Sequence, residues 1–393
     1  MYLARELSGL ERFEPVLDAL PGPAYLVGGT VRDLLLGRPS QFDFDVVVIG
    51  DAEEFARTLA ERLGGTVTTH GRFGTATVHH GGEAHVDVAT ARTESYAAPA
   101  ALPDVAPAET IEDDLGRRDF TINAMAVSLP DAQLIDPFDG LRHLDDRLVR
   151  VLHEQAFVDD PTRIFRGVRY ETRLGFRMDP KTETLALLAV PDVRRLSGAR
   201  VREELYAVFA EDEAPAVLAR LHRFGVDDPL GMRFPTTGVL AALRALDERY
   251  GLRLAPEHLG LLAIDAPAAT LDELKVERRL VRSVDAAHRG AIALRDELEV
   301  SPSAAEVVDA VERAGEDTAL YALALGDQPA LRSYFERLRN VRLDLDGDDL
   351  AALGLTESPR VGEVLAELRR RKLNGELDGR AEELAAAREL IAE

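Results

Sequence analysis

The pattern of apolar and polar positions divides the chain into a head with mixed signals and a long helical remainder. Helical spacing of apolar residues predicts a helix at 52–63. Runs that alternate between apolar and polar residues predict three strands in the head, at 66–69, 74–79 and 85–89. From about residue 145 onward the strand signals fade, and helical spacing continues almost to the end, with helices predicted at 163–174, 199–210 and 214–224.

The stretch from Tyr25 to Val48 combines a glycine turn with a pair of acidic residues. An apolar run ends at Gly28 and Gly29, and apolar residues at helical spacing follow. Residues without side chains before a helix let backbone N–H groups approach a phosphate closely. Farther on, Asp43 and Asp45 alternate with apolar residues, so both carboxylates face one side of a strand. A divalent cation such as Mg²⁺ would relieve their repulsion. Each half alone is also compatible with a plain turn and a solvated strand.

Later in the head come a possible third carboxylate, a loop and an arginine pair. Asp87 lies on the strand predicted at 85–89, where it either joins the acidic pair or is a solvated strand residue. The stretch 90–114 is rich in alanine, proline and acids, which predicts a loop. Arg117 and Arg118 then begin the sequence RRDFTINAMA. Taken alone, this pair would be a surface turn.

A polar ridge marks the helix predicted at 163–174. Asp160 precedes Arg163, Arg166 and Arg169, which follow at steps of three residues. Steps of three drift only about 60° around a helix, so the four polar heads form one slanted ridge. A capping aspartate followed by solvated arginines is the plain alternative.

Composition restricts the class of protein. The 393 residues suit two to four domains. A formal charge of −23 argues against nonspecific nucleic-acid binding, and the absence of cysteine excludes disulfides and cysteine-bound zinc. The N-terminal segment is amphipathic and charged throughout, and no apolar run approaches the roughly 20 residues of a membrane span. A cytoplasmic protein without a membrane or an evident protein partner is therefore expected.

The motifs occur in an order that resembles a known family. The glycine turn, the D-x-D strand, RRDFTINAMA and D-D-x-x-R at 159–163 together resemble the class II tRNA nucleotidyltransferases, the CCA-adding and A-adding enzymes grouped with bacterial poly(A) polymerases. The resemblance implies an α+β protein with a polymerase-β-like nucleotidyltransferase head of mixed sheet and helices and an otherwise all-helical chain. The implied domains are a catalytic head at 1–140, a nucleotide-templating neck at 141–210, a helical body at 211–340 and a tRNA-binding tail at 341–393.

The same resemblance implies roles for individual residues. Asp43 and Asp45 would hold two Mg²⁺ ions, and Asp87 would join them as a catalytic carboxylate. The remaining nucleotide-binding residues would contact the triphosphate, the ribose or the base: Gly28, Gly29, Arg32, Arg118, Asp160, Arg163, Arg166 and Arg169. Asp139 stands where the family usually has glycine.

Base choice would fall to the first two residues of the ridge. Cytosine and adenine both place an amine donor beside a ring-nitrogen acceptor, whereas uracil and guanine present the reverse. The carboxylate of Asp160 would accept from the amine and the guanidinium of Arg163 would donate to the ring nitrogen. Each bidentate contact of this kind discriminates by ~1 to 3 kcal/mol.

The implied activity is the addition of CMP and AMP, from CTP and ATP, to the 3′ end of tRNA without a nucleic-acid template. Addition of A alone, addition of CC alone, poly(A) synthesis and RNA binding without catalysis stay open as alternatives. A basic run of four residues near the C-terminus would contact the tRNA body, or would only balance the dipole at a helix C-terminus: Arg369, Arg370, Arg371 and Lys372.

Overall fold

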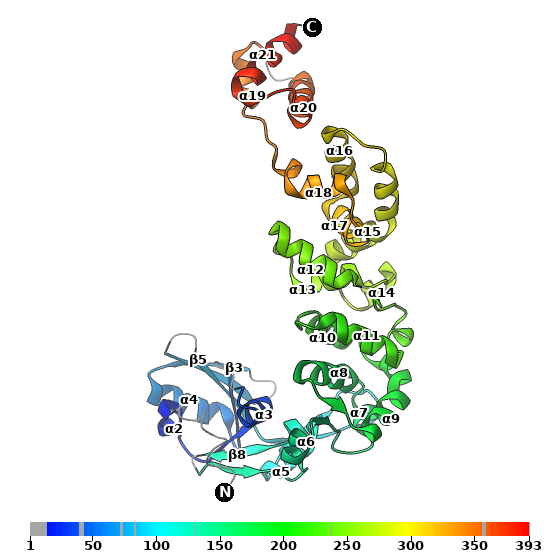
Figure 1. The fold of residues 1–393 in the computed structure, drawn as a ribbon. Coiled ribbons are helices and arrows are strands. Elements are labelled where there is room, and N and C mark those ends of the chain that lie inside the picture. Colours follow the sequence, from blue (N-terminus) through cyan, green and yellow to red (C-terminus); the bar gives the residue numbers. More distant parts are fainter. Residues whose placement is uncertain are drawn as a thin grey trace. The chain divides into compact units, whose positions relative to one another are not determined.

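The computed structural model shows an α+β head followed by helices, as the sequence predicts (Figure 1). Residue contacts divide the chain into two compact units. The first runs up to Glu204 and includes Arg223–Leu230; the second holds Leu205–His222 and the chain from Gly231 onward. The four-domain division stays a prediction. The structure describes residues 14–38, 43–70, 74–81, 84–129, 131–236, 238–355 and 359–392.

A seven-stranded mixed sheet forms the centre of the first unit. Its strands are β1 (Ala24–Val27), β2 (Asp43–Val48), β3 (Thr66–His70), β4 (Thr75–His80), β5 (Ala84–Thr90), β8 (Ala126–Leu129) and β9 (Gln133–Ile135). They lie in the order β3-β4-β5-β2-β1-β8-β9. Only β2 and β5 run parallel; the other neighbours are antiparallel. The three strands predicted from alternation are β3, β4 and β5, each correct within one residue at either end.

One face of this sheet is apolar and packs against α4 (Ala52–Leu63), whose bounds match the predicted helix. Asp51 caps its N-terminus by accepting from two backbone N–H groups, and Gly64 ends it in the left-handed conformation. Phe44 and Val46 of β2 are buried on this face. Because side chains alternate along a strand, Asp45 lies on the opposite face of the sheet.

The stretch 90–114, predicted as a loop, instead contains a β-hairpin and the start of a helix. Strands β6 (Arg92–Ser95) and β7 (Asp104–Pro107) pair antiparallel, and α5 (Ile111–Gly116) begins with a capping box made by Thr110. The prolines misled the prediction. Two of the three lie outside both strands, and Pro107 is the last residue of β7 in a two-stranded ribbon, where its missing N–H costs no interior ladder bond.

The rest of the first unit is mostly helical. Its helices include α2 (Glu14–Ala19), α3 (Gly29–Leu35), α6 (Gly140–Asp145), α7 (Ala156–Asp159), α8 (Thr162–Leu174) and α9 (Pro180–Ala189), with 3-10 turns at Thr121–Asn123 and Val190–Arg195. A short parallel pair, β10 (Leu148–Val149) and β11 (Arg177–Met178), interrupts the predicted all-helical run. Asp139 adopts φ 58° and ψ 30°, a region that favours glycine and that aspartate tolerates. This conformation explains how aspartate replaces the usual glycine.

The second unit is helical. Helices α10 (Gly198–Phe209) and α11 (Ala214–Phe224) cross the unit boundary and match the predicted 199–210 and 214–224. The helices that follow are α12 (Val239–Tyr250), α13 (Pro256–Ala263), α14 (Ala268–Glu273), α15 (Arg278–Glu297), α16 (Ala304–Ala314), α17 (Glu316–Ala324), α18 (Pro329–Glu336), α19 (Gly347–Ala352), α20 (Pro359–Leu373) and α21 (Gly379–Ala392). The last three share an apolar cluster that includes Leu350, Leu368 and Ala387. None of the helices in the described ranges has the length and apolarity to cross a membrane.

A buried glycine in α13 packs directly against an aromatic ring of α10 in the second unit. A Cβ atom on Gly260 would clash with the ring carbons of Phe209, which is itself fully buried. We expect Gly260→Ala to destabilise the protein by about 3 kcal/mol, because overpacking a rigid core costs this much. The matched control is Gly362→Ala in α20, where the added methyl meets open space and favours the helix. Urea unfolding followed by circular dichroism measures both, and equal midpoints would contradict the packing argument.

Candidate active site

Two neighbouring cavities of the first unit collect most of the predicted residues. The first has a volume of about 430 Å³ and is lined on its sheet side by Asp45, Asp87 and Thr77. The second has a volume of about 260 Å³ and is lined by both glycines of the turn and by three residues of the polar ridge, Asp160, Arg163 and Arg166. Arg117 and Arg118 line both cavities, which therefore adjoin at the arginine pair.

Strand register brings the predicted carboxylates together in the first cavity. Asp45 of β2 and Asp87 of β5 are partners in the parallel pair, so their side chains lie side by side on one sheet face. Thr77 stands opposite Asp87 on β4 and donates a hydrogen bond of 2.6 Å to Asp87 Oδ1. Asp43 is paired with His85 in the same register; its side chain is outside the described part of the structure. The structure thus places Asp87 beside Asp45, and its catalytic role stays a prediction.

The glycine turn packs directly against the arginine pair. Gly28 has φ 70°, and a Cβ atom there would lie 2.7 Å from Arg118 Nη1. Only glycine fits this conformation and this contact without strain. The helix that follows, α3, has only seven residues, so its dipole is short. The glycine turn would therefore help a phosphate mainly by letting it approach the backbone closely.

Arg117 and Arg118 are fixed by an acid on α5. Asp114 is fully buried, with Oδ1 accepting from Arg117 and Oδ2 from Arg118 at 3.0 Å. Burial alone would raise the pKa of Asp114, but the two guanidinium groups bring it below its usual value. Arg118 keeps a buried Nε–H without an acceptor among the described residues, which gives a bound anion a hydrogen-bond donor.

Asp160 and Arg163 each have one polar atom bonded to the protein and a second polar atom that could bond to a ligand. Asp160 Oδ1 accepts from the backbone N–H and hydroxyl of Thr162 and from Arg200 Nη2, the last at 2.6 Å. Arg163 Nη2 donates to the Arg117 carbonyl at 2.9 Å, while its Nη1 is buried without an acceptor in the described residues. Arg163 is only 5% exposed and Asp160 lines the same cavity. An acceptor, Oδ2, and a donor, Nη1, remain for a ligand.

The other two arginines of the ridge are held by acids. Arg166 donates two hydrogen bonds to Asp119 Oδ2, at 2.8 and 2.6 Å. Burial would raise the pKa of Asp119, but Arg166 and the hydrogen bond from Asn123 lower it. Arg169 lies 3.6 Å from Glu204, whose pKa is raised by burial. Arg166 lines the second cavity, whereas Arg169 is outside its lining.

Arg32 lies behind the lining of the second cavity. It is 4% exposed, paired with Asp33, bonded to Asn123 Oδ1 at 2.7 Å and placed over the Tyr170 ring. Arg32 is not among the residues that line either cavity. Its guanidinium therefore supports the walls of the second cavity through Asn123 and Tyr170, which do line it.

Several further residues of the lining were missed in the sequence, among them three polar residues from the strands and the hairpin. Glu94 and Tyr96 come from the hairpin that was predicted to be a loop, and Thr77 from β4. The signal for the first two was the alternation of R-T-E-S-Y, which places Glu94 and Tyr96 on one side of a strand. The prolines that follow outweighed it.

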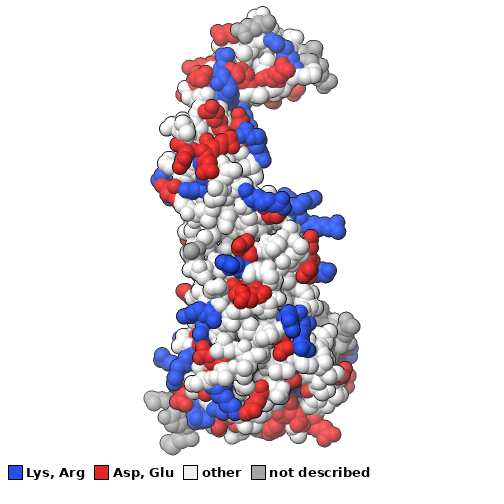
Figure 2. Space-filling model, turned by 90° about the vertical axis from the view of Figure 1, so that its right-hand side faces the viewer, with Lys and Arg blue, Asp and Glu red and all other residues white. Residues whose placement is uncertain are grey.

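The basic run near the C-terminus is fully ion-paired. Arg369 pairs with Glu312, Arg370 and Arg371 with Glu367, and Lys372 with Asp344 and Glu383. Figure 2 shows the wider pattern, with basic side chains in separate groups between acidic ones. A tRNA contact at this run stays a prediction, and the ion pairs favour the alternative of a structural helix end.

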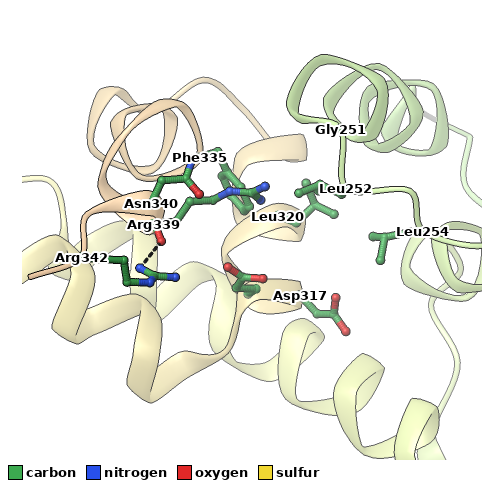
Figure 3. Close-up of a pocket in the computed structure, with 10 residues that line it drawn as sticks. Gly251, Leu252, Leu254, Asp317, Leu320, Phe335, Arg339, Asn340 and Arg342 are labelled. Carbon is green, nitrogen blue, oxygen red and sulfur yellow. Dashed lines mark hydrogen bonds between the residues drawn. The ribbon is translucent and has the colours of Figure 1, made fainter. Parts of the chain in front are cut away.

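A separate pocket of about 340 Å³ lies in the second unit between the loop after α12, α17 and the chain after α18. Figure 3 shows Arg339 extended across it toward Leu252, with Arg342 hydrogen-bonded to the Arg339 carbonyl. Arg339 also lies over the Phe335 ring. Among the described residues that line this pocket, none has a buried donor or acceptor without a partner. The pocket therefore offers a polar ligand fewer unused hydrogen-bonding groups than the cavities of the head.

Comparison with known proteins decides the family. A model of the poly(A) polymerase head domain matches residues 24–150. The A-adding tRNA nucleotidyltransferase of Halalkalibacterium halodurans is 34% identical, over 93% of this chain and 88% of that protein. The chain belongs to the class II tRNA nucleotidyltransferase family. The CC-adding tRNA nucleotidyltransferase of Deinococcus radiodurans is 31% identical, over 92% of this chain and 88% of that protein.

A solved structure matches nearly the whole length of this nucleotidyltransferase. The Thermotoga maritima CCA-adding enzyme complexed with tRNA is 30% identical with a TM-score of 0.78, and the match covers 99% of this chain and 98% of that chain. The resemblance inferred from the motifs is confirmed, as is the α+β fold with a helical remainder. Nucleotidyltransferases of this family use a divalent metal ion. The relatives differ in the nucleotides that they are named for.

Proposed function

We propose that this nucleotidyltransferase adds CMP and AMP, taken from CTP and ATP, to the 3′ end of tRNA in the cytoplasm and so builds or completes the CCA terminus. One observation carries the proposal: Asp160 Oδ2 and Arg163 Nη1, an acceptor and a donor without a partner among the described residues, belong to residues that line the same cavity. Cytosine and adenine present the complementary donor and acceptor. Uracil and guanine would leave both protein groups facing like partners.

The first cavity fits a divalent cation in its chemistry. Carboxylate oxygens on neighbouring strands are hard donors of the kind that Mg²⁺ prefers, and Asp43 continues the same register. We assign Mg²⁺ to Asp43 and Asp45; when bound, it supplies charge stabilisation to the phosphates and lowers the pKa of the attacking hydroxyl. In the described residues whose side chains are placed, which leave out Asp43, no group of three possible ligands occurs.

The chain's own groups would orient the triphosphate and the attacking hydroxyl. Arg118 donates to phosphate oxygens through its open Nε–H, and Gly28 allows this approach. Arg166 and Arg169 would contact the phosphates or the ribose. Arg32 would hold Asn123 and Tyr170 in the wall of the second cavity. The 3′-oxygen of the RNA then forms a bond to the α-phosphorus, and the bond to pyrophosphate breaks. Asp87 lies where it can take the hydroxyl proton.

Thr77 orients Asp87 for this step. Its hydrogen bond occupies Asp87 Oδ1 and leaves Oδ2 for the hydroxyl. We expect Thr77→Val, which keeps the shape but removes the donor, to lower kcat about 10-fold while the KM for ATP stays the same. Thr77→Ser should restore most of the rate. Rapid-quench assays separate kcat from KM; a Thr77→Ser rate as low as that of Thr77→Val would show that the hydroxyl has no such role.

The experiment that tests the proposed function uses three labelled tRNA transcripts. They end before CCA, after C and after CC, and each is incubated with Mg²⁺ and with CTP or ATP alone. A complete CCA-adding enzyme extends the first two with CTP and the third with a single A. Extension of none of them would leave an RNA-binding protein without catalysis, and unlimited A tails would indicate a poly(A) polymerase.

Addition of A alone is the second candidate. The relative from Halalkalibacterium halodurans is named for this activity, and its match spans 93% of this chain. In the transcript assay an A-adding enzyme extends only the CC-ended transcript. Both candidate activities are compatible with the motifs of this chain, so the product pattern is what separates them.

A further inference from the structure

Tyr96 lies beside the pair proposed to choose the base. It follows β6, lines the second cavity with Asp160 and Arg163, and donates a hydrogen bond of 3.1 Å to Glu94 Oε2. Glu94 is itself held by Arg92 and Arg117. Burial raises the pKa of Tyr96 to about 12 against the opposing charge of Arg163, so the phenol is neutral at physiological pH.

The hairpin that carries Tyr96 is anchored at its tip. The Ala100 N–H donates to the Val158 carbonyl at 3.1 Å, and Arg200 Nη1 donates to the Ala100 carbonyl at 3.0 Å. Arg200 uses its other nitrogen on Asp160. The position of the Tyr96 ring relative to Asp160 is therefore fixed from both ends of the hairpin.

Two aromatic rings line this cavity, and they differ in their cation contacts. Tyr170 has three guanidinium groups within about 6 Å of its ring centre, those of Arg32, Arg166 and Arg173. Among the described residues, no ring or guanidinium lies against the ring of Tyr96. The half-buried Tyr96 ring thus has no aromatic or cationic partner among the described residues, in a cavity whose other walls are mainly charged or polar.

We propose that Tyr96 is the stacking surface for the base of the incoming nucleotide. This inference rests on the proposed function, because it assumes a base held at its edge by Asp160 and Arg163. Hydrogen bonds at the edge leave both faces of the base to be covered. Stacking on an aromatic side chain stabilises a base without regard to its identity, whereas the edge contacts select it. Tyr96 would therefore increase the affinity for any incoming nucleotide, and Asp160 and Arg163 would select the base.

The test compares two substitutions of Tyr96 in the full-length enzyme at saturating tRNA. Tyr96→Phe keeps the ring and loses the bond to Glu94, and we expect the KM for ATP and CTP to stay within about 2-fold. Tyr96→Leu removes the ring, and we expect both KM values to rise about 10-fold with a smaller change in kcat, in line with measured losses of base stacking. Leu102→Ala, at a 75% exposed position of the same hairpin, is the control and should match the wild type.

The outcomes separate this inference from the proposed function. A wild-type enzyme that transfers no nucleotide to any transcript overturns the proposed function. A wild-type enzyme that transfers, with Tyr96→Leu equal to it, overturns the stacking role alone. Equal KM increases for Tyr96→Phe and Tyr96→Leu would assign the effect to the hydroxyl and contradict stacking. If Tyr96→Leu does not fold, Tyr96→Met replaces it with the same expectations.

Discussion

Asp45→Asn is expected to lower kcat for nucleotidyl transfer by at least about 1,000-fold. Asp45 lies beside Asp87 on the polar face of the sheet and accepts from the Thr30 hydroxyl at 3.4 Å. Asparagine keeps the size and an acceptor but removes the charge that would hold the divalent ion. Loss of a group that stabilises charge in a phosphoryl-transfer transition state costs about 4 kcal/mol, which corresponds to this factor.

Single-turnover extension of a CC-ended tRNA with ATP measures this loss. The matched control is Asp51→Asn, because asparagine caps a helix as well as aspartate does, so α4 should keep its start and the enzyme its rate. If Asp45→Asn retains more than a tenth of the wild-type kcat while Asp51→Asn behaves as expected, Asp45 does not hold the catalytic metal.

Asp160→Asn is expected to lower the preference for ATP over GTP, and for CTP over UTP, by about 100-fold. Thr162 and Arg200 both donate to Oδ1 of Asp160, so the side-chain oxygen of asparagine must occupy the Oδ1 position. The amide nitrogen then faces the cavity, where it donates to a carbonyl and repels an amine. One reversed contact of this kind changes discrimination by ~1 to 3 kcal/mol, and each base loses one good contact while its competitor gains one.

The ratio of kcat/KM values measures this change, for ATP and GTP on a CC-ended tRNA and for CTP and UTP on a tRNA that ends after C. Asp159→Asn is the control, since Asp159 is the neighbouring acid and is outside the lining of the cavity. Its ratios should equal those of the wild type. An Asp160→Asn enzyme that is slower but equally selective would remove Asp160 from base choice.

Local periodicity predicted the elements that form the frame of the site. The strands β3, β4 and β5 were found from alternation, and α4 and α8 from helical spacing; in β4, α4 and α8 this spacing reflects a buried face. The two predicted acids of the D-x-D strand follow from the same alternation. These features depend on neighbours in sequence, so a single chain carries their signal.

The spatial relations that sequence reasoning could not derive depend on pairing between distant segments. Asp87 meets Asp45 only because β5 runs parallel to β2, a register that spacing does not encode. Glu94 and Tyr96 enter the cavity through a hairpin whose strands are joined by a proline-rich turn. For Arg32, the sequence shows the charge but not Asn123, its partner 91 positions away.

A structure of the protein with a non-hydrolysable ATP analogue and Mg²⁺ tests the central claim most directly. We expect the adenine amine within hydrogen-bond distance of Asp160 Oδ2, its ring nitrogen within that distance of Arg163 Nη1, and the triphosphate between Arg118 and the carboxylates of Asp45 and Asp87. A base bound away from α8, or a triphosphate directed away from the acidic strands, would contradict the account.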